Sequence, residues 1–204
     1  MEHRARSGES AGEIANSDRC TAKNLDRHCK RSEAYFPSLA IMIRKSAFAP
    51  IVDARTRVLI LGSLPGEASL LAGRYYAHPR NQFWQLVGTA IAVNLVALDY
   101  ADRLAALQAA GVGLWDTVAS AQRKGSLDAA IRAAQAAPLG GLVSTLPALR
   151  AIAFNGATSA RIGRRELAGS VAPAMLDLPS SSPAHASLTL AEKQARWNLL
   201  RKFL

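Results

Sequence analysis

Short strand-like segments that stop at glycine or polar residues are the feature of this sequence that most constrains its fold. The run 58–61 is apolar at every position and stops at Gly62. Such a run is typical of a strand buried on both faces, as in a parallel sheet whose two sides are covered. Further strand-like segments are found at 112–118, 151–154 and 175–178. We therefore predict strands at these positions.

The segments between these strands have helical patterns. Residues 81–93 carry apolar side chains at helical spacing, and a second helix is expected at 101–110. A third helix is expected at 126–137, with Ser126 as its N-cap. The stretch 189–192 has the pattern of a capping box and opens a final helix. Strands that alternate with helices predict an α/β fold, a three-layer α/β/α sandwich around a mostly parallel sheet of about four strands.

The first 45 residues differ from the remainder of the chain. Residues 1–45 hold nine Lys or Arg, six Asp or Glu and both cysteines, and they show no sustained apolar period before Tyr35. We predict a flexible N-terminal extension over 1–45 and a single domain over 46–204. The predicted domain keeps 16 Lys or Arg against 9 Asp or Glu, so it is basic without the extension.

The composition excludes several classes of protein. Half of the 204 residues are hydrophobic and 20% are charged, which excludes a disordered or fibrous chain. No stretch approaches the roughly 20 apolar residues that cross a bilayer, and the N-terminus lacks the apolar segment of a signal peptide. The two cysteines, Cys20 and Cys29, exclude a four-cysteine zinc or iron–sulfur site and a disulfide scaffold within this chain. We expect a cytoplasmic protein that binds no metal and no membrane.

The net charge is +10 and the isoelectric point is near 10.3. A basic soluble protein attracts polyanions, nucleic acid first among them. A surface made basic for solubility gives the same total, so charge alone leaves both interpretations open.

Polar and glycine-rich segments follow three of the predicted strands, at 62–66, 155–156 and 178–184. Ligands of parallel sheets bind beyond the carboxyl ends of the strands, so we expect these segments to form one site. The first segment, Gly-Ser-Leu-Pro-Gly, permits a sharp turn and close backbone approach. A phosphate or the edge of a base would fit there, and so would a turn that binds no ligand.

Residues 75–84 read Tyr-Tyr-Ala-His-Pro-Arg-Asn-Gln-Phe-Trp, a dense aromatic and polar segment in a chain with 6% aromatic residues. Tyrosine faces stack on bases, and an Asn side chain can hold a water or a polar edge. The last two residues fit core positions of the helix that follows. Core packing does not account for Tyr76, His78 and Asn81.

Six motifs occur in an order that resembles the uracil-DNA glycosylase superfamily, namely GSLPG, YYAHPRNQFW, GVGLWDTV, GSLDAAI, FNG and LPSSSPAHA. They most resemble its hypoxanthine (deoxyinosine) DNA glycosylase branch and extend over 47–204. The resemblance implies a monofunctional enzyme that flips a deaminated base, hypoxanthine first, out of DNA. It would hydrolyse the glycosidic bond and leave an abasic site for base excision repair. The implied enzyme binds DNA and uses no cofactor. Nothing in the sequence suggests an obligate oligomer, so we expect a monomer.

The resemblance also implies roles for individual residues. Asn81 is the catalytic residue that positions the attacking water, Tyr76 stacks on the flipped base, and Asn155 hydrogen-bonds the base edge. The base pocket is lined by the loop of Gly62, Ser63, Leu64, Pro65 and Gly66. DNA contacts are implied for Ser180, Ser181, Ser182, Pro183 and His185. For His185, phosphate contact and simple solvent exposure remain equal alternatives.

The first loop departs from the pattern of related branches. In mismatch-specific uracil glycosylases an Asn of this loop helps to position the attacking water, and other branches carry an acid there. Residues 62–66 hold neither, which argues against efficient uracil excision. Asn81 can orient a water but is a poor base, because an amide does not take up a proton near neutral pH. Hypoxanthine leaves as a delocalised anion, for which a weak catalyst suffices.

Other charged residues have structural interpretations. We expect His78 to set the turn before the first helix and Asp116 to tie loops together at a strand end. Asp128 fits the first turn of the expected third helix, where negative charge is favoured. Arg123 and Lys124 are expected to contact phosphate or solvent. No lysine lies in the matched site motifs, so a lyase step through a Schiff base is not predicted.

Two other functions remain open at this point. One is a glycosylase of the same superfamily that acts on uracil or xanthine, which a panel of substrates would separate from the first hypothesis. The other is a non-catalytic nucleic-acid-binding module on the same fold. The presence of Tyr76, Asn81 and Asn155 favours an enzyme over such a module.

Overall fold

The computed structural model describes residues 44–169 and 173–204. Its first element is strand β1 (Arg44–Ser46), so two residues that we assigned to the extension, Arg44 and Lys45, belong to a strand. The other residues of the predicted extension, 1–43, lie outside the described residues.

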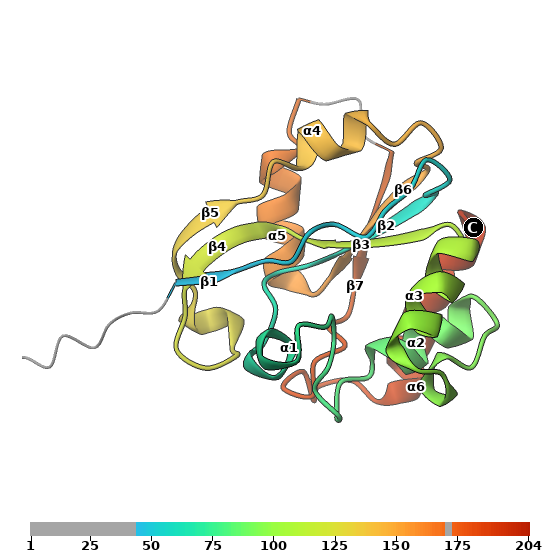
Figure 1. Cartoon of the computed structure of the whole chain (residues 1–204), viewed down its shortest axis with the longest axis horizontal. Helices are drawn as coiled ribbons and strands as arrows, with labels where there is room; N and C mark the ends of the chain where they lie inside the picture. Colours follow the sequence, from blue (N-terminus) through green and yellow to red (C-terminus); the bar gives the residue numbers. More distant parts are fainter. Residues whose placement is uncertain (1–43, 170–172) are drawn as a thin grey trace, which may run out of the picture. The chain divides into compact units, whose positions relative to one another are not determined.

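The central sheet is parallel and four-stranded, in the order β3-β2-β6-β7 (Figure 1). Its strands are β2 (Val58–Gly62), β3 (Val112–Asp116), β6 (Ala151–Asn155) and β7 (Ala174–Leu178). Every residue of β2 is buried, as expected for an apolar run at the centre of a covered sheet. The predicted strands at 58–61, 151–154 and 175–178 are confirmed.

Helices cover both faces of the central sheet (Figure 1). Val58 and Ile60 pack in one core with residues of α2 (Phe83–Ala90), α3 (Tyr100–Ala109) and α6 (Leu190–Trp197). Leu59 and Leu61 pack on the opposite face with residues of α4 (Leu139–Ser144) and α5 (Ala157–Glu166). Successive β2 side chains therefore point to opposite layers, and the predicted three-layer α/β/α sandwich is confirmed.

Shorter elements connect these layers. Helix α1 (Glu67–Ala72) follows the first glycine-rich loop. Short 3-10 helices are η1 (Leu95–Ala97), η2 (Asp128–Ala130) and η3 (Asn198–Lys202). Within residues 44–169 and 173–204, no helix is long and apolar enough to cross a membrane.

A second sheet replaces two of the predicted elements. The expected single strand over 112–118 breaks at Thr117, and β4 (Val118–Gln122) continues as the middle strand of an antiparallel sheet in the order β1-β4-β5. The expected helix over 126–137 is wrong, because η2 is followed there by strand β5 (Arg132–Ala136).

The physical reason is the pairing of β5 with β4. The alanines of β5 favour a helix by intrinsic propensity, but propensity is a weak preference that contacts with other segments override. Antiparallel pairing with β4 satisfies the backbone groups of both segments instead. The pairing is irregular, and Ala133 has a φ of +46°.

The final helix begins as predicted. Thr189 Oγ1 accepts a hydrogen bond from the Glu192 backbone N–H, and Glu192 Oε2 accepts one from the Thr189 N–H at 2.8 Å. At the other end of α6, the buried Trp197 donates its indole N–H to the Pro179 carbonyl at 3.0 Å. The helix is thereby attached to the loop that follows β7.

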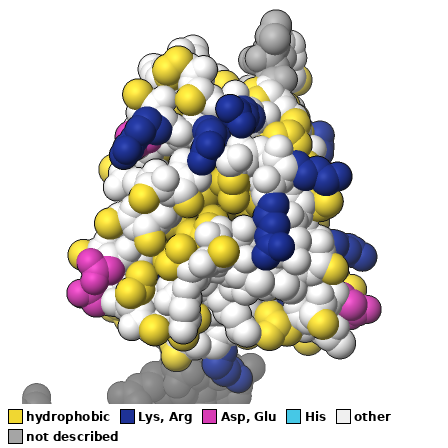
Figure 2. Space-filling view, turned by 90° about the vertical axis from the view of Figure 1, so that its right-hand side faces the viewer, with side chains coloured by type: hydrophobic (Ala, Val, Ile, Leu, Met, Phe, Trp, Pro, Cys, Tyr) yellow, Lys and Arg dark blue, Asp and Glu magenta, His cyan; other side chains and the backbone are white. Residues whose placement is uncertain are grey.

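The surface reflects the basic composition. Figure 2 shows one face of the molecule, on which Lys and Arg side chains lie mainly above and to the right of a central area of hydrophobic side chains, and acidic side chains lie mainly at the margins.

Candidate active site

A cavity of about 430 Å³ opens at the carboxyl ends of the central strands. The three segments that we expected to converge all line it. From the first loop and its surroundings come Gly62, Ser63, Leu64, Pro65, Gly66, Tyr76, His78 and Asn81, and from later segments come Asp116, Asp128, Asn155 and residues 180–185. The structure thus places every predicted site residue at one cavity.

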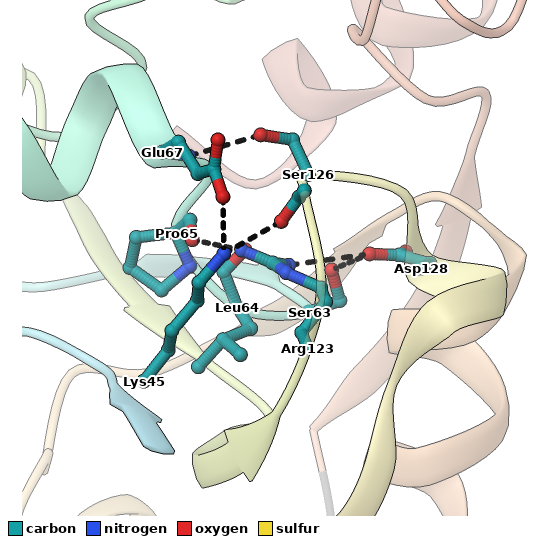
Figure 3. A network of polar contacts seen from close by, with 9 residues as sticks. Lys45, Ser63, Leu64, Pro65, Glu67, Arg123, Ser126 and Asp128 are labelled. Atoms are coloured by element: carbon teal, nitrogen blue, oxygen red, sulfur yellow. Dashed lines mark hydrogen bonds and ion pairs between the residues drawn. The ribbon is translucent and has the colours of Figure 1, made fainter. Parts of the chain in front are cut away.

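Arg123 hydrogen-bonds to the backbone of the first loop, residues 62–66 (Figure 3). Its buried guanidinium donates to the Leu64 carbonyl at 3.1 Å and to the Pro65 carbonyl. The expectation that Arg123 contacts phosphate or solvent is therefore wrong. A permanently charged guanidinium with several N–H donors is well suited to bind two adjacent carbonyls, and here it fixes the shape of the first loop, although its Nε has no hydrogen-bond partner among the described residues.

The same loop is attached to the segment after β4 by a second set of contacts (Figure 3). Ser63 Oγ donates to Asp128 Oδ1 at 2.6 Å, and Asp128 Oδ1 lies 3.9 Å from an Arg123 nitrogen. Asp128 lies in the first turn of the 3-10 helix η2 and not in that of the expected α-helix. Ser126 does not cap a helix of its own segment as expected; its Oγ accepts from the N–H of Glu67, the first residue of α1, at 3.0 Å.

Tyr76 is supported on one face. Its ring stacks on Phe83 with centroids 3.6 Å apart and an interplanar angle of 7°. The Trp84 indole N–H donates to the Tyr76 carbonyl at 3.2 Å. The backbone of Tyr76 has a φ of +51°, a left-handed conformation that is rare for an aromatic residue and is found mostly at functional sites. Burial raises the pKa of Tyr76, so its hydroxyl keeps its proton.

The turn before α2 presents Asn81 to the cavity. His78 Nδ1 accepts from the Arg80 N–H at 3.2 Å, which agrees with the expected turn-setting role of His78. Asn81 Oδ1 accepts from the Phe83 N–H at 3.0 Å. This bond fixes the side chain and leaves the Asn81 amide nitrogen to donate to other groups.

Asn155 connects two walls of the cavity. Its Nδ2 donates to the Ser181 hydroxyl at 2.9 Å and to the Tyr76 hydroxyl at 3.3 Å. Its Oδ1 accepts from the Ser181 N–H at 2.8 Å. Both hydrogens of the amide and its oxygen are therefore engaged within the protein.

The serine loop after β7 is also ordered by its own side chains. Ser180 Oγ accepts from the Ser182 N–H at 3.2 Å, and Ser182 Oγ accepts from the Ala184 N–H at 3.3 Å. Ser181 is buried, and its carbonyl accepts from the Gln82 N–H at 3.0 Å. The half-exposed His185 lies at the rim, with Nε2 3.4 Å from the Ser187 hydroxyl.

Asp116 is the site residue whose importance the sequence reasoning missed. It lies at the end of β3, in register with Gly62, and only 3% of it is exposed. Among the described residues, its Oδ2 has no hydrogen-bond partner, so the expected loop-tying role is not evident. The pKa of Asp116 is raised to about 7, chiefly because burial disfavours the charged carboxylate. Asp128 acts in the same direction, whereas Arg123 and the Tyr75 hydroxyl oppose it.

A sequence signal for Asp116 does exist. It is an acid at the carboxyl end of a strand, beside a glycine at the matching position of the next strand. A Cβ on Gly62 would lie 2.5 Å from Asp116 Oδ1 and 3.3 Å from the Tyr76 hydroxyl. Only glycine fits there without displacing one of these groups.

Comparison with known proteins identifies relatives of this chain. The family described as the uracil DNA glycosylase superfamily matches residues 49–201. A hypoxanthine DNA glycosylase of Methanosarcina barkeri is 38% identical over 117 residues, which cover 57% of this chain and 74% of that protein. A hypoxanthine DNA glycosylase of Methanosarcina acetivorans is 41% identical over 112 residues, which cover 55% and 71% of the two chains.

The fold has a similar solved structure. A solution NMR structure of a candidate uracil DNA glycosylase from Methanosarcina acetivorans superposes with a TM-score of 0.70 at 34% identity. The match covers 79% of this chain and 99% of that one.

Proposed function

Since the chain belongs to the uracil DNA glycosylase superfamily and groups with its hypoxanthine DNA glycosylases, we propose that it is a monofunctional glycosylase that removes hypoxanthine from DNA. The observation that carries this proposal is the cavity in which Tyr76, Asn81 and the serine loop meet at the carboxyl edge of the sheet. The product would be an abasic site in an intact strand.

The cavity offers what a flipped base needs. Extruding a base from the duplex costs a few kcal/mol, and stacking on an aromatic ring returns about 1–3 kcal/mol. Tyr76 lines the cavity and its ring is backed by Phe83, so it can serve as a rigid stacking platform. The flanking phosphates would be held by the serine loop of residues 180–182, with Pro183 and His185 at its rim, and attracted by the overall positive charge.

The chemistry requires a positioned water and stabilisation of a departing anion. The free amide nitrogen of Asn81 would orient the water toward C1′, and the bond to Phe83 holds Asn81 in place. The C1′–N bond breaks with its electron pair moving to the base, and the water oxygen bonds to C1′. The water gives up one proton to solvent or to the departing base. Water is the co-substrate, and the step as proposed calls for no cofactor.

A covalent step is not part of the proposal. Among the described residues that line the cavity there is no lysine and no cysteine. The nearby Lys193 is buried and donates to Gln82 Oε1 at 2.9 Å. We therefore expect the abasic strand to break only after alkali.

A base-release assay tests the proposal. Labelled duplexes that carry deoxyinosine, xanthine, uracil or only normal bases are incubated with the protein, then treated with alkali or left untreated. We expect breakage only after alkali and strongest for deoxyinosine. Breakage confined to uracil would favour the sister activity. No release from any duplex or single strand would favour the non-catalytic binding module.

Substitution of Asn81 tests the mechanism. We expect Asn81→Ala and Asn81→Ser to slow release by about a hundredfold or more, in the range that positioning groups contribute. The serine keeps an acceptor for the Phe83 N–H, so a loss in both variants reports on the amide and not on folding. The matched control is Asn94→Ala, at an exposed Asn outside this cavity. Full rate in both Asn81 variants would refute the role of Asn81.

The expectations about oligomeric state and cellular location also belong to this proposal. We propose that the protein acts as a monomer on DNA, which light scattering of the free protein and of its DNA complex would test. A cytoplasmic location and the independence from membranes stay predictions.

A further inference from the structure

Most polar groups at the cavity are already engaged with other parts of the protein. The Asn155 amide bonds Ser181 and Tyr76 through all its groups, and Ser63 and Asp128 bond each other. Asn155, which the resemblance assigned to reading the base edge, is therefore committed to the walls of the site. Asp116 is different, because its Oδ2 has no partner among the described residues.

The surroundings of Gly62 show where the other oxygen of this carboxyl, Oδ1, lies relative to Tyr76. The missing Cβ of Gly62 leaves a gap that both Asp116 Oδ1 and the Tyr76 hydroxyl border. Asp116 thus lies at the hydroxyl end of the Tyr76 ring, and both residues line the cavity. A base stacked on the open face of Tyr76 would present its edge on this side. The buried Oδ2 has no partner among the described residues, and a bound base would supply one.

We propose that Asp116 binds the flipped base as a neutral carboxylic acid, accepting from the ring N–H and donating its O–H to the adjacent carbonyl oxygen. This inference rests on the proposed glycosylase function and assigns the reading of the base edge to Asp116 instead of Asn155. The two bonds form a closed pair between a carboxylic acid and a lactam, the N–H–C=O edge that deamination creates.

The surroundings of Asp116 favour the neutral acid near neutral pH. Burial raises its pKa to about 7, and Asp128 supports that shift. Arg123, from the end of β4, and the Tyr75 hydroxyl oppose it. Tyr76, His78 and His185 also line the cavity.

The acid would contribute to the reaction as well as to recognition. When the C1′–N bond breaks, negative charge spreads over the purine to its carbonyl oxygen, and the Asp116 O–H points at that oxygen. A donor aimed at developing charge in a water-poor site lowers the barrier. Asp116 keeps its proton throughout, because the proton that the reaction releases comes from the attacking water. An ionised Asp116 would face the departing anion and oppose it.

The inference defines a class of substrates. Hypoxanthine, xanthine and uracil all carry a ring N–H beside a carbonyl, so each can form the closed pair. Guanine and thymine carry the same edge, so this pair separates lactam bases from adenine and cytosine and does not by itself separate damaged from normal bases. Adenine can pair with a carboxylic acid in the reverse sense, but its edge has no oxygen to take up the developing charge. We therefore expect Asp116 to increase the release rate of lactam bases, and to have a smaller effect on the binding of adenine.

The test compares single-turnover release of hypoxanthine from a deoxyinosine duplex between pH 5.5 and 9. The variants are Asp116→Asn, Asp116→Ala and the control Asp177→Asn, at an exposed acid paired with Arg164. For the wild type we expect a rate about tenfold lower at pH 8 than on the acid side, and about a hundredfold lower at pH 9. Asp116→Asn keeps a donor and an acceptor but cannot ionise, so its rate should not show this fall. Asp116→Ala should be slower than Asp116→Asn at every pH by at least about tenfold.

The outcomes separate the inference from the proposed function. All variants share the same histidines, so the difference between the wild type and Asp116→Asn isolates Asp116. A wild-type rate that is flat or rises with pH would overturn the inference, and so would the same fall in Asp116→Asn. A wild-type rate that rises with pH, together with an inactive Asp116→Asn variant, would instead identify Asp116 as a general base. Failure of the wild type to release any base at any pH would overturn the proposed function itself.

Discussion

Asp116→Asn should change the pH dependence of protein stability even in the absence of DNA. In an unfolded chain an Asp has a pKa of about 3.9. In the folded protein burial raises the pKa of Asp116 to about 7. The folded state therefore binds more protons than the unfolded state between these values. The stability associated with the neutral form is complete below pH 4, is lost as pH rises through 7, and is constant above that.

The size of the effect follows from the difference between the two pKa values. A difference of about three pKa units corresponds to about 4 kcal/mol of unfolding free energy over the whole range. Between pH 5 and pH 8 the wild type should lose about 2–3 kcal/mol through this group alone, whereas Asp116→Asn loses none of it. Any constant effect of the amide on packing cancels when the variant is compared with itself at the two pH values.

The assay is urea denaturation of the wild type, Asp116→Asn and Asp177→Asn at pH 5 and pH 8. We expect the stability difference between Asp116→Asn and the wild type to shift by about 2–3 kcal/mol in favour of the variant at pH 8. Asp177 is exposed, so its variant should follow the wild type. Equal pH dependence of the wild type and Asp116→Asn would refute the reasoning, because it would mean that Asp116 titrates as a solvated carboxyl.

Three further predictions concern the framework of the site. Gly62→Ala places a Cβ 2.5 Å from Asp116 Oδ1, so it should lower the unfolding free energy by about 1–3 kcal/mol and slow base release. The control is Gly140→Ala, where nothing lies within 4 Å of the added Cβ, and it should neither lower stability in thermal unfolding nor slow release. Arg123→Met keeps much of the buried volume but leaves two loop carbonyls unpaired, so denaturation should show a loss of about 1.5–3 kcal/mol, and an unchanged stability would contradict the role of this network. Thr189→Ala removes one capping bond and should lower stability by about 1 kcal/mol without changing the release rate at 25 °C, and a slower release would connect α6 to the chemistry.

The parts of the fold that local chemistry determines were predictable. The buried strand at 58–61 and the capping box at 189–192 follow from apolar runs and from side-chain hydrogen bonds between near neighbours. The segment 132–136 was not predictable in this way. Its alanines favour a helix, and the strand forms because β4 offers hydrogen-bonding partners from elsewhere in the chain.

The same division applies to the site. Parallel strands bring their carboxyl ends together, so the convergence of loops at one cavity could be predicted from strand order alone. The burial of Arg123 and the free oxygen of Asp116 could not, because each depends on contacts between residues far apart in the sequence. The charge of a residue does not predict which backbone carbonyl it hydrogen-bonds or which cavity it lines.

Asn155 has a consequence for how such a site can be altered. One amide joins the aromatic platform at Tyr76 to the loop at Ser181, which lie 79 and 26 positions away from it along the chain. A change that shifts the loop toward a different backbone conformation of DNA would also shift the platform, and the reverse holds for a change made to admit a larger base. Binding of the DNA strand and recognition of the damaged base are therefore coupled, and a change in one alters the other. A transplanted serine loop would work in another glycosylase of this fold only if its matching amide were transplanted with it.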